Sequence, residues 1–355
     1  MLEIEYVYGG KAKEKPIEGA PLGFGKIFTD HMFLMDYFDG QWRNPRIVPY
    51  APITIDPATM VLHYAQETFE GLKAYKSDKG EIFLFRPEMN AKRFRHSNER
   101  LCMPEIPEED FVQAVKELVL VDRDWIPTGK LSSLYIRPFC YATETAVGVH
   151  PSSKYSFVII LSPVGNYYEK GLSPVSIKIE ENYVRAVLGG TGGIKCGGNY
   201  AGSILAQSEA KKEGYDQVLW LDGVRRRYIE EVGTMNVFFA FKDEIVTSPC
   251  AGSVLPGVTR DSCIALLKDR GYKVSVRPLG VDEMISKLKQ GELLESFGTG
   301  TAAVISPIGS YGYKGERIVI GDGKTGPISR WLFDTLTGIQ EGQLDDPYGW
   351  RVRIA

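Results

Sequence analysis

Short runs of apolar, β-branched and aromatic residues recur along this chain, and turn-forming residues separate them. Residues 71–87 predict a hairpin whose turn is Asp78-Lys79-Gly80, and residues 134–141 and 155–162 predict buried strands. The stretch Glu231–Phe241 predicts a further strand. A chain with this many strand signals must build at least one sheet with an apolar face, and it needs helices or a second sheet to cover it.

Helical patterns lie between some of these runs. Residues 87–100 predict a helix with Pro87 near its start, and apolar spacing predicts an amphipathic helix over 108–121. Residues 200–213 predict another, and Thr259 is the expected N-cap of a later one. Because strands and helices do not alternate strictly, the pattern favours an α+β fold over a doubly wound parallel sheet.

Composition narrows the class of protein. The 355 residues carry a net charge of −3, which argues against binding to a nucleic-acid backbone. The five cysteines include no CxxC, and no Cys/His cluster has metal-ligand spacing, so no metal is expected. The start lacks a signal-peptide pattern, and no apolar run approaches the roughly 18 residues of a membrane span. We expect a cytoplasmic protein.

The segment PVGNYYEKGLSP is rich in glycine and proline and suggests a domain boundary. We expect a small N-terminal α/β domain over residues 1–163, a linker over 164–174 and a larger C-terminal domain over 175–355.

Lys195 stands in the glycine-rich stretch GGTGGIKCGGNY. A lysine among glycines is more often a solvated turn, and the Walker A pattern fails because no Ser or Thr follows the lysine. A helix is predicted directly after it, however. Burial lowers the pKa of a lysine ammonium and yields the neutral amine that Schiff-base chemistry requires.

Two further segments could hold an anionic, heteroaromatic cofactor. Glu231 in EVGTMN is a surface carboxylate on the simpler interpretation, but at a strand end it could pair with a protonated ring nitrogen. Val258 and Thr259 precede a predicted helix, whose N-terminal N–H groups could bind phosphate, although a plain N-cap is the commoner use of threonine.

Gly298, Gly300 and Ala303 satisfy G-x-G-x-x-A, so dinucleotide binding must be considered. We reject it because no helix is expected after the motif and no βαβ unit follows. The backbone of such a loop could still hold a phosphate or a carboxylate. Arg93 is a candidate for charge-assisted bonds to phosphate, although a lone helical arginine is normally on the surface.

Taken in order, these segments resemble the branched-chain amino acid aminotransferases, which are pyridoxal 5'-phosphate (PLP) enzymes of fold type IV, the D-amino-acid aminotransferase-like fold. The resemblance rests on LHYAQETFEGLKAY, SLYIRP, KCGGNY, QVLWLDG and EVGTMN, and it covers nearly the whole chain. The FTDHM and LYIRP segments resemble the larger, eukaryotic-like subgroup. Ala303 and Ser306 replace the CxxC that some members of that subgroup carry.

The resemblance implies a reversible transfer of the amino group of L-leucine, L-isoleucine or L-valine to 2-oxoglutarate. Lys195 would be the Schiff-base lysine, Glu231 the partner of the pyridinium nitrogen, and Tyr200 the donor to the phenolic oxygen. The other implied cofactor-binding residues are Arg93, Thr234, Val258, Thr259 and Thr301. The implied substrate-binding residues are Phe24, Tyr64, Phe69, Tyr135, Arg137, Tyr167, Thr234, Thr301 and Ala302, with Val149 reaching the pocket of the partner in a homodimer.

Alternative functions share parts of this pattern. A D-amino-acid aminotransferase or an aminodeoxychorismate lyase of the same fold would keep Lys195 and Glu231. A nicotinamide oxidoreductase would use the loop 298–303. A binding protein without enzymatic activity would have no need of a nucleophilic lysine.

Overall fold

The computed structural model describes residues 1–7, 9, 12–17, 21–129, 131–165 and 172–355. The chain divides into two compact units. Unit 1 comprises the described residues of Met1–Tyr167, together with Lys195–Gly197 and Gly338–Ala355, and unit 2 comprises those of Tyr168–Ile194 and Gly198–Thr337. The predicted linker falls largely outside the described residues, so the boundary at 164–174 stays a prediction.

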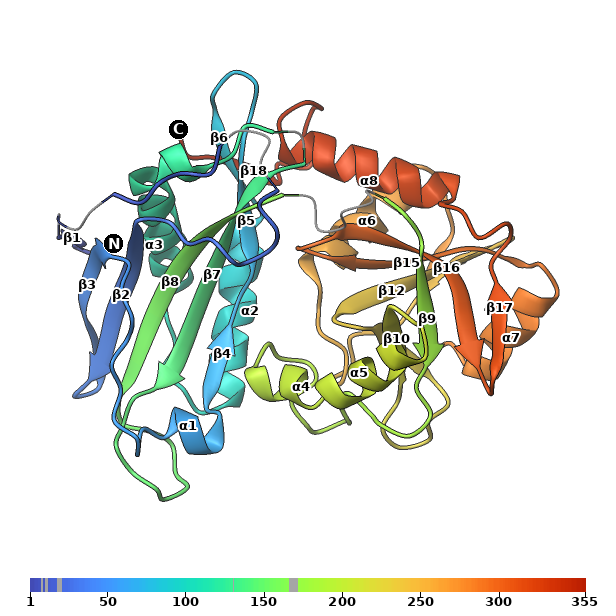
Figure 1. The fold of residues 1–355 in the computed structure, drawn as a ribbon, viewed down its shortest axis with the longest axis horizontal. Helices are drawn as coiled ribbons and strands as arrows, with labels where there is room; N and C mark the ends of the chain where they lie inside the picture. Colours follow the sequence, from blue (N-terminus) through green and yellow to red (C-terminus); the bar gives the residue numbers. More distant parts are fainter. Residues whose placement is uncertain (8, 10–11, 18–20, 130, 166–171) are drawn as a thin grey trace. The chain divides into compact units, whose positions relative to one another are not determined.

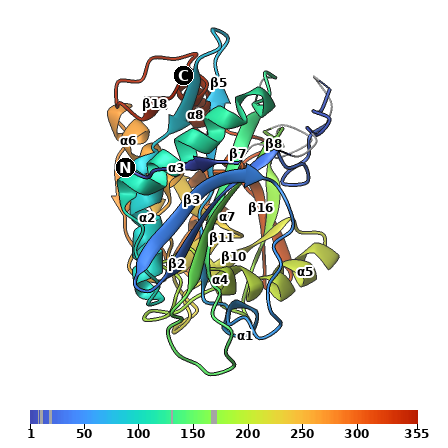
Figure 2. The same ribbon diagram turned by 90° about the vertical axis from the view of Figure 1, so that its left-hand side faces the viewer.

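Unit 1 is built on a nine-stranded, mostly antiparallel sheet (Figures 1 and 2). The strand order is β1 (Glu5–Tyr6), β3 (Gln41–Pro49), β2 (His31–Phe38), β8 (Tyr155–Val164), β7 (Ser133–Ala142), β5 (Leu72–Lys76), β6 (Ile82–Phe85) and β18 (Arg351–Arg353), and β4 (Glu67–Phe69) pairs with β7. The hairpin predicted over 71–87 is confirmed as β5 and β6.

Two helices cover this sheet, α2 (Pro87–Arg100) and α3 (Glu108–Val121), and both match their predicted bounds. Proline suits the first position of α2 because no intrahelical partner exists there for an N–H. The first turn of α3 is acidic, which complements its dipole. Phe94 of α2 and Phe111 of α3 meet Phe157 of β8, with ring centroids 5.5 and 5.9 Å from it. Two short helices complete the unit, α1 (Val61–Tyr64) and the 3-10 helix Arg123–Trp125.

Unit 2 contains a second nine-stranded sheet, in which six strands close into a barrel because β11 pairs with both β10 and β12. The barrel consists of β9 (Val175–Ile179), β10 (Gln217–Leu221), β11 (Ile229–Val232), β12 (Met235–Phe241), β15 (Leu293–Gly300) and β16 (Val304–Tyr313). The remaining strands are β13 (Ile245–Thr247), β14 (Val274–Val276) and β17 (Glu316–Val319). Apolar side chains such as Ile177, Leu219 and Phe239 form its core.

The remaining helices are α4 (Gly197–Ala201), α5 (Ile204–Lys212), α6 (Val258–Asp269), α7 (Val281–Lys289) and α8 (Pro327–Gln340) (Figure 1). The single helix predicted over 200–213 is wrong in detail, because the chain breaks at residues 202–203 between α4 and α5. The strand predicted over 231–241 likewise splits into β11 and β12 around Gly233, whose φ of 55° favours glycine.

The α+β class is confirmed, since most neighbouring strands in both sheets pair antiparallel. In unit 2, helices join two parallel pairs, β9 with β10 and β13 with β14, but this βαβ order does not extend through the sheet. Across the described residues, no helix has both the length and the apolarity needed to cross a membrane.

Candidate active site

Lys195 belongs to unit 1, where its main chain lies between strand β4 and helix α2. Its carbonyl oxygen accepts a hydrogen bond of 3.0 Å from the Phe69 N–H, and its own N–H donates to Ser97 Oγ at 3.1 Å. Its Nζ lies 4.7 Å from the centroid of the Phe69 ring. The lysine is therefore half-buried, with its backbone fixed on both sides and its amine over an aromatic face.

Four of the predicted substrate-binding residues lie together in the same unit. The rings of Phe24 and Tyr135 have centroids 4.9 Å apart, and Arg137 Nη2 donates to the Tyr135 hydroxyl at 2.9 Å. The Arg137 guanidinium carbon also lies 4.8 Å from the centroid of the Phe69 ring. Gly71 is required beside them, because a Cβ there would lie 2.2 Å from the Tyr135 hydroxyl oxygen. The arrangement is an aromatic cluster that carries a single guanidinium.

Arg93 is not a surface arginine. Its Nε donates to Glu70 Oε1 at 2.7 Å and its Nη2 to Glu70 Oε2 at 2.8 Å, and both side chains are buried. Burial alone would raise the pKa of Glu70, but the Arg93 guanidinium, the charge of Lys195 and a hydrogen bond from Asn90 hold that pKa below its ordinary value. Sequence reasoning missed Glu70. Its carboxylate stands beside the aromatic and apolar residues of FEGL, which was a local signal for a buried, paired charge.

Tyr64 and Val149, also predicted to bind substrate, belong to unit 1 as well. The Tyr64 hydroxyl donates to the Val147 carbonyl, and the exposed fractions of Tyr64, Val147 and Val149 are 36%, 70% and 82%. The loop that carries both valines is held by Glu144, which accepts from the Ser153 N–H at 2.6 Å. Hydrogen bonds from Ser153 and His150 lower the pKa of Glu144 to about 2. Tyr167, also predicted for the pocket, lies outside the described residues.

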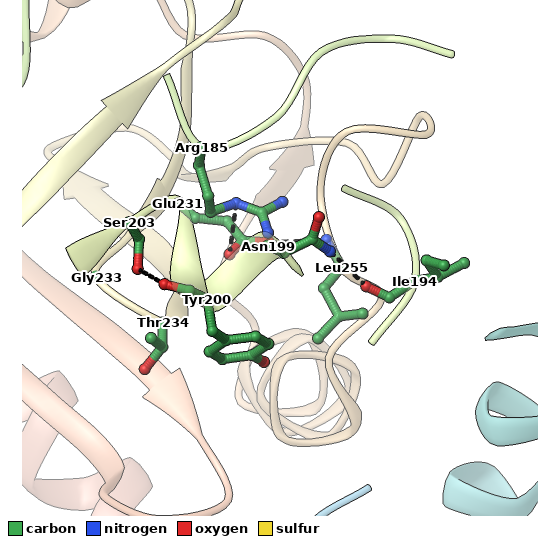
Figure 3. Close-up of a pocket in the computed structure, with 9 residues that line it drawn as sticks. All are labelled: Arg185, Ile194, Asn199, Tyr200, Ser203, Glu231, Gly233, Thr234 and Leu255. Carbon is green, nitrogen blue, oxygen red and sulfur yellow. Dashed lines mark hydrogen bonds and ion pairs between the residues drawn. The ribbon is translucent and has the colours of Figure 1, made fainter. Parts of the chain in front are cut away.

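In unit 2, Glu231 is a buried carboxylate on β11 (Figure 3). Its Oε1 accepts from the Leu255 N–H at 2.7 Å, and its Oε2 lies 3.3 Å from Arg185 Nε in an ion pair. Tyr200 and Thr234 line the same small pocket. Three of the predicted cofactor-binding residues thus converge, and Arg185, which the sequence analysis did not single out, supplies a positive charge beside the carboxylate.

The loop before Tyr200 is fixed by the side chain of Asn199. Its Nδ2 donates to the Thr191 carbonyl at 2.8 Å and to the Ile194 carbonyl at 3.0 Å. The Tyr200 carbonyl oxygen accepts from Ser203 Oγ at 2.7 Å (Figure 3). These bonds hold the first turn of α4 and leave the Tyr200 ring at the pocket wall.

The N-cap of α6 is Gly257, so the prediction that Thr259 caps this helix is wrong. Thr259 lies one residue inside the helix, because the chain is already helical at Val258. A Cβ at Gly257 would lie 2.0 Å from Asn236 Oδ1, which explains why glycine precedes the helix. The N–H groups of Val258 and Thr259 have no intrahelical acceptor because they lie in the first turn, and the glycine N-cap has no side chain that could accept from them.

Thr301 and Ala302 lie in the turn between β15 and β16. These strands are antiparallel and directly connected, so the expectation that no helix follows the G-x-G-x-x-A pattern is confirmed. Gly298 and Gly300 instead pack against Met235, since a Cβ at these positions would lie 2.9 and 3.3 Å from its side chain.

Comparison with known proteins adds to this geometry. Residues 67–311 match the family Amino-transferase class IV. Branched-chain-amino-acid aminotransferase 2 of Bacillus subtilis (strain 168) is 52% identical over 355 residues, which is 100% of this chain and 97% of the relative.

Comparison with solved structures leads to the same family. The branched-chain amino acid aminotransferase of Escherichia coli superimposes with a TM-score of 0.76 at 27% identity, over 92% of this chain and 99% of that chain. The branched-chain amino acid aminotransferase of T.th., complexed with N-(5'-phosphopyridoxyl)-L-glutamate, gives a TM-score of 0.72 at 28% identity, over 90% of this chain and 98% of its own. This protein therefore belongs to the class IV aminotransferases and, within them, to the branched-chain amino acid aminotransferases.

Proposed function

We propose that this chain transfers the amino group of L-leucine, L-isoleucine or L-valine reversibly to 2-oxoglutarate with PLP as its cofactor, and that the residues grouped above carry out the reaction. The observation that carries the proposal is the cluster of Phe24, Phe69 and Tyr135 with one guanidinium, in the same unit as Lys195. An apolar side chain and a carboxylate-bearing side chain can both find complementary groups there.

The residues of unit 2 fit the cofactor. A phosphate suits the uncapped N-terminus of α6, where the N–H groups of Val258 and Thr259 would hold it. A protonated ring nitrogen suits the buried carboxylate of Glu231, whose position is fixed by Leu255 and Arg185. Tyr200 would donate to the phenolic oxygen, and Thr234 and Thr301 would complete the site. The contact of Arg93 with the phosphate stays a prediction, because Glu70 binds this guanidinium in unit 1.

When bound, PLP acts as an electron sink that makes the proton on the substrate Cα acidic. The Lys195 amine would hold the cofactor between turnovers and would carry the proton that leaves the substrate Cα. Glu231 would keep the ring nitrogen protonated. Thr301 and Ala302 orient the substrate α-carboxylate through the turn between β15 and β16.

Arg137 would bind the distal carboxylate of glutamate. Its Nε is buried and has no hydrogen-bond partner among the described residues, so the guanidinium retains a donor for an incoming anion. Leucine, isoleucine and valine differ by about one methylene, which an apolar pocket distinguishes by only about 1–3 kcal/mol. We therefore expect overlapping activity on all three.

We also propose that this protein forms a homodimer. Val147, Val149 and Tyr64 form an exposed apolar surface whose loop is held in place by Glu144, and a partner's pocket is a suitable environment for it. We further propose the division of the chain into an N-terminal domain (1–163), a linker (164–174) and a C-terminal domain (175–355). We also propose a cytoplasmic location, which is consistent with five cysteines that form no disulfide.

The visible absorption spectrum of the purified protein tests the proposal. L-leucine added without an acceptor should convert the bound-PLP band to that of the aminated cofactor, and 2-oxoglutarate should restore it. A PLP band that responds to D-alanine but not to L-leucine would favour a D-amino-acid aminotransferase, and one that ignores both would favour a lyase. A protein that binds no PLP would refute the assignment.

A further inference from the structure

The segment Lys195–Gly197 is held to unit 1 at three points. Two are the backbone bonds of Lys195 to Phe69 and to Ser97 Oγ. The third is the Gly197 N–H, which donates to the Glu67 carboxylate. A Cβ at residue 197 would lie 2.1 Å from Glu67 Oε1, so the carboxylate occupies the space that any larger residue would need. Glu67 therefore fixes the chain two residues after the lysine.

Glu67 lies on the same face of β4 as Phe69, and the Arg137 guanidinium carbon lies 4.8 Å from the centroid of the Phe69 ring. Strand β4 pairs with β7, the strand that carries Arg137. Burial raises the pKa of Glu67, while the Gly197 hydrogen bond and the Arg137 charge oppose this rise. The Glu67 charge in turn adds to the effect of burial in raising the pKa of Cys140, also on β7. The carboxylate is thus in a partly desolvated place where its charge acts strongly on neighbours.

The two substrates make opposite demands on Arg137. Glutamate brings a carboxylate of its own, whereas a branched-chain substrate brings none, and a desolvated guanidinium without a counter-charge is costly. Glu67 can supply that counter-charge while an apolar side chain is bound. The same negative charge repels the distal carboxylate of glutamate when it arrives.

We propose that Glu67 is a specificity-determining and positioning residue, which balances Arg137 in favour of branched-chain substrates and holds Gly197 so that Lys195 keeps its direction. This inference rests on the proposed function, because it takes Arg137 as the residue that binds the distal carboxylate of glutamate.

Two substitutions at Glu67 distinguish its specificity role from its positioning role. Glu67→Gln keeps an oxygen that can accept from the Gly197 N–H but removes the charge. We expect KM for L-glutamate to fall and KM for L-leucine to rise, each by roughly three- to ten-fold, with kcat little changed. Glu67→Ala removes the oxygen as well, so we expect an additional fall of kcat with both substrates. Glu109→Gln, an exposed charge change in the same unit, is the matched control and should alter neither constant.

Hydrogen exchange of the PLP-loaded protein gives a readout independent of turnover. The Gly197 amide should exchange faster in Glu67→Ala than in the parent protein, and at the parent rate in Glu67→Gln. An unchanged ratio of the two KM values in Glu67→Gln would overturn the specificity role, and unchanged exchange in Glu67→Ala would overturn the positioning role. If the parent protein itself does not transaminate L-leucine, the proposed function fails, whereas the exchange result still decides the positioning role.

Discussion

The candidate site residues fall into two groups, one in each unit, that are stabilised in different ways. In unit 2, main-chain groups provide most of the contacts of the candidate site. The Leu255 N–H donates to the Glu231 carboxylate, and the glycine N-cap leaves the first N–H groups of α6 available to a ligand. In unit 1, side chains dominate, with aromatic rings around Arg137 and a buried pair of Arg93 and Glu70. Backbone donors suit a ligand that never changes, such as a cofactor. Aromatic surfaces with one charge suit substrates that alternate between apolar and anionic side chains.

The largest expected effect comes from Lys195→Ala. Removing the amine should abolish transamination, with kcat lower by at least about 10⁴-fold, because both the covalent attachment and the proton transfer are lost. If unit 2 holds the cofactor as proposed, PLP should still copurify by non-covalent binding. Absorption spectra after gel filtration measure this, and a variant that binds no PLP would assign cofactor retention to the lysine instead.

Glu231→Gln tests the unit 2 group directly. It removes the charge that would keep the ring nitrogen protonated and leaves the buried Arg185 without its counter-charge, so we expect kcat to fall by about 10²–10³-fold. The neighbouring Glu230 is a matched control, because it is also buried on β11 and bonds Ser253. Equal losses in Glu231→Gln and Glu230→Gln would mean that the effect is structural rather than specific to the cofactor.

Arg137→Met tests the unit 1 group. We expect kcat/KM for L-glutamate to fall by about 10- to 100-fold, the value of a charge-assisted hydrogen bond, while L-leucine changes only a few-fold. Steady-state kinetics with both amino acids measure the difference. A parallel loss for both substrates would show that Arg137 mainly supports Tyr135 and the fold of the pocket.

The smallest expected effect concerns a buried charge in unit 1 outside the site. Burial lowers the pKa of Lys73 on β5 to about 8, and the negative charge of Glu341 only partly offsets this. Unfolding restores the ordinary pKa, so the folded state binds fewer protons between about pH 8 and 10.5, and stability rises with pH in that window.

Lys73→Met should therefore raise the free energy of unfolding by about 1–3 kcal/mol at pH 7, with a smaller gain at pH 10. Urea unfolding at both pH values checks this. Lys79→Met in the exposed turn of the same hairpin is the control. A loss of stability in Lys73→Met would mean that the interaction with Glu341 outweighs the desolvation of the lysine.

Local patterns predicted much of the fold. Helices α2 and α3 were predicted to the residue, because apolar periodicity and a starting proline are local signals. The break between α4 and α5, and the Gly257 cap of α6, were missed. The cap depends on the approach of Asn236 to Gly257, which no local pattern contains. The break falls at Gly202 and Ser203, and a glycine inside a predicted helix is a local signal that the prediction did not use.

The candidate site shows the same limit. Family motifs identified Lys195, Glu231 and Tyr200, but not the partners that hold them. Arg185, Glu70 and Glu67 each act through a contact with a residue more than 20 positions away in sequence. Such pairings become visible only when the chain is folded.

Strand β18 has a consequence for how this protein is made. It pairs with β6 and thereby covers the edge of a sheet whose other strands all lie within the first 164 residues. During synthesis that edge stays open until Arg351–Arg353 have been made, long after the other strands of the sheet, and an open strand edge invites pairing with other chains. Residues 351–353 therefore protect a sheet whose other strands are made much earlier, and a chain that stops before Arg351 would leave the edge of β6 open to aggregation.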